Sequence, residues 1–183
     1  MSVLHLVRHG RVVDHLLDGS EDPPLSDIGH AQAKAASAVL RGDYLATSPY
    51  RRCLETAEPI AAATGLEVVT VSEVGEVVPE EYDPDRRRTF LRDFMGGAWS
   101  GQPEWLCEWR RRVLDALGDL ARRGDEVIVV SHYVAINVAA GAATSDDRTT
   151  VFHPTNCSIS TFQLVDGKLT AVSLGAASHL PTN

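Results

Sequence analysis

Short apolar runs alternate with longer amphipathic stretches along most of the chain. Runs rich in β-branched residues predict strands, and the two most apolar runs suit strands that are buried on both faces. The pair Asp166-Gly167 between two such runs predicts a two-residue hairpin turn. The predicted strands cover 3–7, 44–47, 66–71, 126–130, 157–165 and 168–174.

Helices are predicted between these strands by their capping residues and periodicity. Ser26 caps a helix that ends near Gly42. Its apolar stripe, expected to face the core, consists of Ile28, Ala31, Ala35 and Val39. Ser48 followed by Pro49 predicts a second helix start, and Pro59 is expected to end or kink that helix. Further helices are predicted up to residue 95, over 103–123, and up to about residue 143.

This alternation predicts an α/β protein, in the form of a three-layer α/β/α sandwich with a mainly parallel sheet and an antiparallel edge strand. A chain of 183 residues is expected to form a single domain, 1–183. The segment 76–104 breaks the alternation, because an acidic, proline-containing stretch is followed by three consecutive arginines. We expect it to form a cap or insertion over the functional site, packed by Trp99, Trp105 and Trp109.

The composition excludes several classes of function. The formal net charge of -8 argues against general affinity for nucleic acid or anionic membranes, so an anion site must be a local cluster of arginines. No stretch approaches the roughly 20 apolar residues of a spanning helix. Three cysteines without a CxxC pair indicate a reduced, cytoplasmic protein. No His, Cys or Asp grouping has ligand spacing, so neither a metal nor a cofactor is expected.

Cationic and titratable residues gather where the predicted strands end. His9 follows the first strand between Arg8 and Arg11, and His132 follows the strand at 126–130. Arginines also stand in the first turn of the helix after the second strand. Carboxyl ends of parallel strands and helix N-termini form anion sites in open α/β sheets. Arginine binds phosphate oxygens, and a neutral histidine can attack phosphorus, so the pattern predicts a phosphoryl site.

Four stretches of the sequence resemble successive motifs of the histidine phosphatase superfamily, in its phosphoglycerate-mutase-like branch. They occur in the family's order as LVRHG, PLSDIGHAQA, SPYRRCLETA and VIVVSHY, and NCSIS resembles the late strand. The resemblance implies that His9 is the nucleophile, that Arg8 and Arg52 bind phosphate, and that His132 is the second histidine of the pocket. The arginine pattern selects Arg52 over its neighbour Arg51, which periodicity alone does not separate.

The proton donor of the family is a glutamate in an L-x-E context after the third strand. Val71-Ser72-Glu73 fits that context, which makes Glu73 the expected catalytic acid and Glu76 its competitor.

The chain departs from the family pattern around the leaving group. Arg11 stands where many members have Glu or Gln, and it is either a substrate contact or a solvated loop residue. Tyr133 replaces the glycine that often follows the second histidine. His15 is a weaker candidate in the substrate loop, and the three arginines at 86–88 form either an exposed helix face or a substrate clamp.

Together these features predict a metal-independent phosphomonoester hydrolase that forms a phosphohistidine on His9 and acts on a small phosphorylated substrate. One alternative is a mutase, which returns the phosphoryl group to its substrate. A second alternative is a non-catalytic module that binds phosphate or a phosphoprotein.

Overall fold

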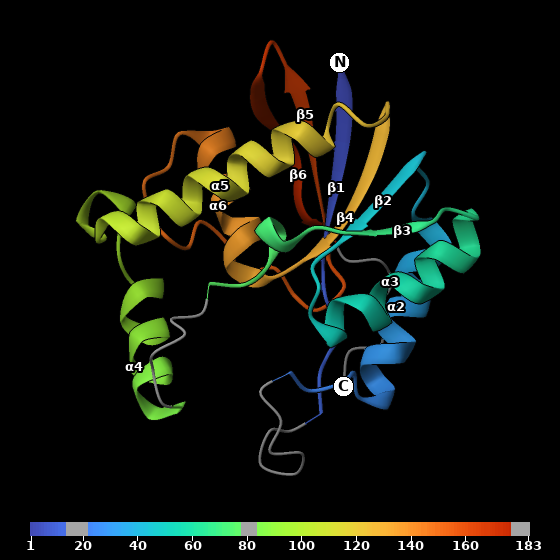
Figure 1. Cartoon of the computed structure of the whole chain (residues 1–183), viewed down its shortest axis with the longest axis horizontal. Helices are drawn as coiled ribbons and strands as arrows, with labels where there is room; N and C mark the ends of the chain where they lie inside the picture. Colours follow the sequence, from blue (N-terminus) through green and yellow to red (C-terminus); the bar gives the residue numbers. More distant parts are fainter. Residues whose placement is uncertain (14–21, 78–83, 177–183) are drawn as a thin grey trace.

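The computed structural model describes residues 1–13, 22–77 and 84–176, with the side chains of 84–88 and 176 left undescribed. Short 3-10 helices are labelled η (Figure 1). In chain order the elements are β1 (Ser2–Arg8), α2 (Asp27–Val39), β2 (Tyr44–Thr47), α3 (Arg51–Thr64), β3 (Val68–Thr70), η1 (Ser72–Val74), α4 (Pro84–Met95), η2 (Trp99–Gly101), α5 (Glu104–Leu120), β4 (Glu126–Ser131), α6 (Tyr133–Thr144), β5 (Ile159–Val165) and β6 (Lys168–Ala176).

The strands form one six-stranded sheet in the order β3-β2-β4-β1-β5-β6. The four strands from β3 to β1 are parallel, whereas β5 pairs antiparallel with β1 and with β6. The predicted turn joins β5 to β6, and both Asp166 and Gly167 have positive φ, as a hairpin of this twist requires. The predicted α/β class, with its mainly parallel sheet and antiparallel edge, is confirmed.

Helices cover both faces of the sheet and form two cores. Alternate residues of the central strands point to opposite faces, so Leu6 and Val129 pack toward α5 and α6. Their neighbours Val7 and Val130 pack toward α2 and α3. Figure 1 shows these two pairs of helices on opposite sides of the strands. This layering leaves the strand ends as the place where polar side chains from different elements can meet.

The buried face of α2 differs from the predicted one. Ile28 and Val39 are 39% and 57% exposed, whereas Gly29, Ala33 and Ala36 are buried. The reason is a close approach of two backbones, because a β-carbon placed on Gly29 would lie 2.0 Å from the carbonyl oxygen of Arg11. The helix therefore turns its small residues inward and leaves its larger ones at the surface.

Pro59 lies inside α3 and does not end it. The helix continues to Thr64 and ends at Gly65, which adopts the left-handed conformation with φ 75°. A proline removes one amide donor, while Ala57 and Ile60 on either side of it are fully buried against the sheet. Packing of this face offsets the missing hydrogen bond.

No helix among residues 1–13, 22–77 and 84–176 is long and apolar enough to cross a bilayer.

Alanine substitution of two helical glycines should shift stability in opposite directions. Gly29→Ala forces a β-carbon against the Arg11 backbone, and we expect a loss of about 1–3 kcal/mol in the free energy of unfolding. Gly118→Ala in α5 meets nothing nearer than an arginine nitrogen at 3.8 Å, and should gain about 0.4–1 kcal/mol. Urea denaturation of both variants measures the two changes. Two changes of the same sign would contradict the packing described for α2.

Candidate active site

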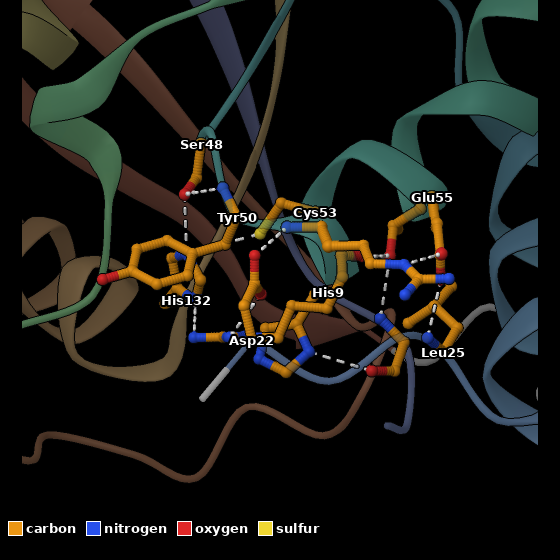
Figure 2. Close-up of polar contacts among 12 residues, drawn as sticks. His9, Asp22, Leu25, Ser48, Tyr50, Cys53, Glu55 and His132 are labelled. Carbon is orange, nitrogen blue, oxygen red and sulfur yellow. Dashed lines mark hydrogen bonds and ion pairs between the residues drawn. The ribbon is translucent and has the colours of Figure 1, made fainter. Parts of the chain in front are cut away.

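Three parallel strands deliver the residues of the site to one edge of the sheet. Arg8 and Ser131 are paired at the ends of β1 and β4. The amide of His9 donates to the carbonyl of Ser131 at 3.0 Å, and the amide of Ser48, after β2, donates to that of Val130 at 3.0 Å. The strand pairing thus continues one residue beyond the strands. It brings the rings of His9 and His132 to a centroid distance of 5.3 Å (Figure 2).

His9 is buried, and its ring is held in one tautomer. Nδ1 lies 2.8 Å from the carbonyl oxygen of Gly10, so this nitrogen carries the hydrogen and Nε2 keeps a lone pair. Burial, together with the charges of Arg52 and Arg8, lowers the pKa of His9 to about 3. The imidazole is therefore neutral and nucleophilic at physiological pH.

Gly10 permits a close contact behind this histidine. A β-carbon at this position would lie 2.6 Å from the carbonyl oxygen of Gly29. The amide of Gly10 donates to Thr56 Oγ1 at 3.0 Å, which fixes the loop against α3. The backbone of His9 has a further partner, because Asn156 Nδ2 donates to the His9 carbonyl at 2.9 Å.

His132 is fully buried at the N-cap position of α6, and both of its ring nitrogens have polar partners. Arg52 Nη2 lies 3.3 Å from its Nδ1, and Ser48 Oγ lies 2.7 Å from its Nε2. A guanidinium can only donate, so Nδ1 accepts and Nε2–H donates to the serine. Burial first, and then the charge of Arg52, lower the pKa of His132 well below its ordinary value. This second ring is neutral too.

Two arginines supply positive charge beside the histidines. Arg8 donates through Nη1 to the carbonyl of Pro154 at 2.8 Å, while its buried Nε finds no acceptor in the described part of the chain. Burial lowers the pKa of Arg8. The guanidinium of Arg52 stacks on the Tyr50 ring at 4.5 Å, and its side chain is only 13% exposed. Partly desolvated cations with unused donors constitute an anion site.

Asp22 ties the start of α3 to the same pocket. One of its oxygens accepts from the Arg51 amide at 2.7 Å, and the other pairs with Arg52 Nη1 at 3.1 Å (Figure 2). The Arg51 side chain points away: it is 59% exposed and pairs with Glu55 at 2.7 Å. The structure thus places Arg52, and not Arg51, beside His132, in agreement with the arginine that the motif selected.

The two candidate glutamates are placed differently. Glu73 lies in η1 and is exposed. Glu76 is partly buried and sits at the N-terminus of α6, where its carboxylate accepts from the amides of Val77 at 3.1 Å and Val134 at 3.4 Å. It also interacts electrostatically with Arg52 and Arg8. The structure therefore places Glu76, three residues beyond Glu73 and after the turn of η1, beside the two arginines.

The environment of Glu76 changes its proton affinity. Burial is the largest effect and raises the pKa of this carboxyl to about 7, against the opposing influence of two backbone amides and of the arginines. A carboxyl with this pKa is present in both protonation states near neutral pH. It can donate a proton in one step and accept one in the next.

Two cysteines lie buried close to the pocket. Cys53 Sγ is 3.4 Å from His132 Nε2 and 3.7 Å from the carbonyl of Ser131. Burial raises the pKa of the Cys53 thiol well above its ordinary value, and raises that of Cys157 to about 12. Both are free thiols, as is the exposed Cys107.

The other residues that the sequence singled out as candidates for the site lie in several different places. Arg11 is exposed two residues after His9, and its backbone binds Gln32 and Ser26. The arginines at 86–88 belong to α4, but their side chains fall outside the described part, as does all of His15. Trp99 is buried and stacks on Trp109 at 6.4 Å, whereas Trp105 is 42% exposed. Among the described residues, no group of three or more His, Cys, Asp or Glu side chains could hold a metal ion.

Sequence reasoning missed three residues that shape the pocket. Ser48 accepts from His132 Nε2, Tyr50 stacks on Arg52, and Asp22 pairs with Arg52. Ser48 and Tyr50 stand within the SPYRRC stretch directly after a strand, a position that could have marked them. Asp22 carries no such signal, because its partner lies thirty residues away along the chain.

Comparisons with known proteins show which family the chain belongs to. The sequence profile of the histidine phosphatase superfamily (branch 1) matches residues 4–177. The chain is 29% identical over 154 residues to a probable phosphoglycerate mutase of Yersinia enterocolitica, covering 74% of this chain and 72% of that protein. It is 29% identical over 185 residues to phosphoserine phosphatase 1 of Hydrogenobacter thermophilus, covering 88% and 85%. A phosphoserine phosphatase variant of Entamoeba histolytica, solved with phosphoserine, has a TM-score of 0.74 at 24% identity and covers 98% and 100%.

Titration of the glutamate carboxyls should separate Glu76 from Glu73. In a protein labelled with 13C at the glutamate side-chain carboxyl, one signal should titrate near pH 7, and Glu76→Gln should remove it. Glu73→Gln should leave that signal in place, because Glu73 is exposed. The measurement is an NMR titration from pH 4 to 9. Persistence of the neutral-pH signal in the Glu76 variant would contradict the burial of this carboxyl.

Proposed function

The chain belongs to branch 1 of the histidine phosphatase superfamily, and from this premise we propose that it hydrolyses small phosphomonoesters through a phosphohistidine at His9. The observation that carries the proposal is the neutral imidazole of His9, with a free Nε2 lone pair, set beside two partly desolvated arginines. A two-step phosphoryl transfer needs a nucleophile and groups that bind the phosphate anion. Here both kinds of group stand at one edge of the sheet.

In the first step, His9 Nε2 attacks phosphorus and the bond from phosphorus to the leaving oxygen breaks. The phosphoryl group becomes attached to Nε2, and the positive charge of the ring is stabilised by the Nδ1–H bond to the Gly10 carbonyl. The protonated Glu76 carboxyl gives its proton to the leaving oxygen, so that an alcohol departs.

In the second step, water attacks the phosphohistidine. The Glu76 carboxylate takes a proton from this water, the bond from phosphorus to Nε2 breaks, and inorganic phosphate forms. His9 is returned as a neutral imidazole and Glu76 as a carboxylic acid. The cycle therefore uses one water for each ester and leaves the protein unchanged.

Arg8, Arg52 and His132 bind the phosphoryl oxygens in this proposal, and for His132 this requires its Nε2–H to exchange Ser48 for a phosphoryl oxygen. The unsatisfied Nε of Arg8 supports its role, because a phosphoryl oxygen would supply the missing acceptor. Arginines supply the charge that a metal ion gives elsewhere, so the reaction is proposed to need no metal or other cofactor. We also include Arg11 as a substrate contact, since it is exposed two residues after the nucleophile.

Glu76 replaces Glu73 as the proposed acid, because its carboxyl interacts with both arginines of the pocket. We propose further that the segment 76–104, of which 78–83 lie outside the described residues, forms the cap of a single domain. Phe94 and Trp99, both from this segment, are buried in the core beside α5, which supports a fixed attachment of the cap.

Small phosphorylated metabolites are the proposed substrates. Both curated relatives carry names that refer to three-carbon phosphate esters with a carboxylate, phosphoglycerate and phosphoserine. A macromolecular anion is not proposed, since the net charge is -8. The three free thiols support action in the reducing cytoplasm.

A mutase is the second candidate, because one relative of 29% identity is a probable phosphoglycerate mutase. The two activities differ in whether water or substrate receives the phosphoryl group from His9. Incubation with 3-phosphoglycerate and a bisphosphate primer separates them: isomerisation that exceeds phosphate release favours the mutase.

Trapping the covalent intermediate tests the proposed function. Rapid quenching after mixing with 32P-labelled substrate should give protein-bound phosphate that is labile in acid and stable in alkali, as a phosphoramidate is. His9→Ala removes the nucleophile and should abolish the label, whereas His30→Ala, an exposed histidine of α2, should retain it. Label that survives in the His9 variant would refute the assignment.

The role of the acid depends on the leaving group. An alkoxide needs a proton as it departs, whereas p-nitrophenolate leaves without one. Under single turnover, Glu76→Gln should slow phosphorylation by alkyl phosphates about 10²–10⁴-fold and change the release of p-nitrophenol much less. The matched variant Glu73→Gln should show no such selectivity. A selective loss in the Glu73 variant would instead assign the acid to η1.

A further inference from the structure

We infer that Tyr133 and His153 form a subsite for the leaving group, and that this subsite favours leaving groups carrying a carboxylate. The inference rests on the proposed hydrolysis at His9 and specifies its substrate class. Its basis is the Tyr133 hydroxyl, which lies 2.5 Å from Nδ1 of an exposed histidine at the rim of the pocket.

Tyr133 lies on the side of the pocket from which a leaving group departs. The proposed acid, Glu76, must be next to the leaving oxygen, and its carboxylate binds the amide of Val134, the residue after Tyr133. Tyr133 interacts electrostatically with both Glu76 and Arg8, and its ring lies 5.3 Å from the Arg8 guanidinium carbon. Tyr133 therefore lies close to the groups that would contact the leaving oxygen.

His153 is fixed at the rim by the loop that carries it. The next residue, Pro154, accepts from Arg8 Nη1 at 2.8 Å. Further along the loop, Asn156 donates to the His9 carbonyl and the Cys157 amide donates to the Arg8 carbonyl, both at 2.9 Å. Three hydrogen bonds thus join this loop to the end of β1. The His153 ring is placed by the same residues that place the nucleophile.

The bond between the two side chains leaves a hydrogen-bond donor available. If the phenol donates to Nδ1, the histidine carries its hydrogen on Nε2 and offers that N–H. If Nδ1–H donates instead, the phenol offers its O–H. In either arrangement the pair presents a donor. An anionic acceptor is the matching ligand, and a carboxylate on the leaving group is the simplest that a small phosphomonoester provides.

Two pairs of substrates isolate the carboxylate. O-phosphoserine differs from O-phosphoethanolamine, and 3-phosphoglycerate from glycerol 3-phosphate, chiefly by this group. We expect kcat/KM of the unaltered enzyme to be at least tenfold higher for the carboxylated member of a pair. His153→Ala and Tyr133→Phe should each reduce that preference about tenfold, through KM, because a hydrogen bond to a charged group is lost. The loss should be confined to the carboxylated member of each pair, and His30→Ala should keep the full preference.

Binding to a protein that cannot turn over separates this inference from the proposed function. In a His9→Ala background, calorimetry should show tighter binding of O-phosphoserine than of O-phosphoethanolamine, and a second substitution, His153→Ala, should remove the difference. Unchanged affinity for inorganic phosphate would show that the pocket itself is intact. Equal binding of the two esters before the second substitution, or an equal loss for both after it, would overturn the subsite. Selective binding without any hydrolysis by the unaltered enzyme would instead refute the proposed function alone.

Discussion

The parallel pairing of β1 with β4 is the constraint on which the rest of the site depends. Because Arg8 stands opposite Ser131, the next residue of each strand is a histidine, and the two rings meet without any loop to adjust them. β2 pairs with the other edge of β4 and adds Ser48 and the start of α3 at the same level. A shift of one residue in this register would turn one imidazole to the opposite face of the sheet.

Burial then sets the charge states of the groups that the sheet brings together. Two imidazoles close to two guanidiniums are most stable when neutral, so desolvation and repulsion act in the same direction on His9 and His132. The same burial raises the proton affinity of Glu76. A single physical condition, the exclusion of water from the strand edge, thus produces both a free lone pair and an available proton.

The sequence predicted the sheet, the two histidines and the choice between adjacent arginines, because strand periodicity and ordered motifs are local signals. It failed where two distant backbones set the outcome. The approach of Arg11 to Gly29 reversed the buried face of α2, which periodicity alone assigns to the larger side chains. The sequence also could not place the Glu76 carboxyl beside the two arginines, because η1 changes the direction of the chain after β3. Asp22 was missed because its contacts to α3 are tertiary.

The two buried thiols bear on how the protein tolerates oxidants. Cys53 and Cys157 are held in the protonated form by burial, and the thiolate is the form that peroxide attacks. The proposed nucleophile nearby is an imidazole nitrogen, which does not undergo the oxidation of a catalytic sulfur. In the proposed reaction no step depends on a thiolate, although two thiols lie buried close to the pocket.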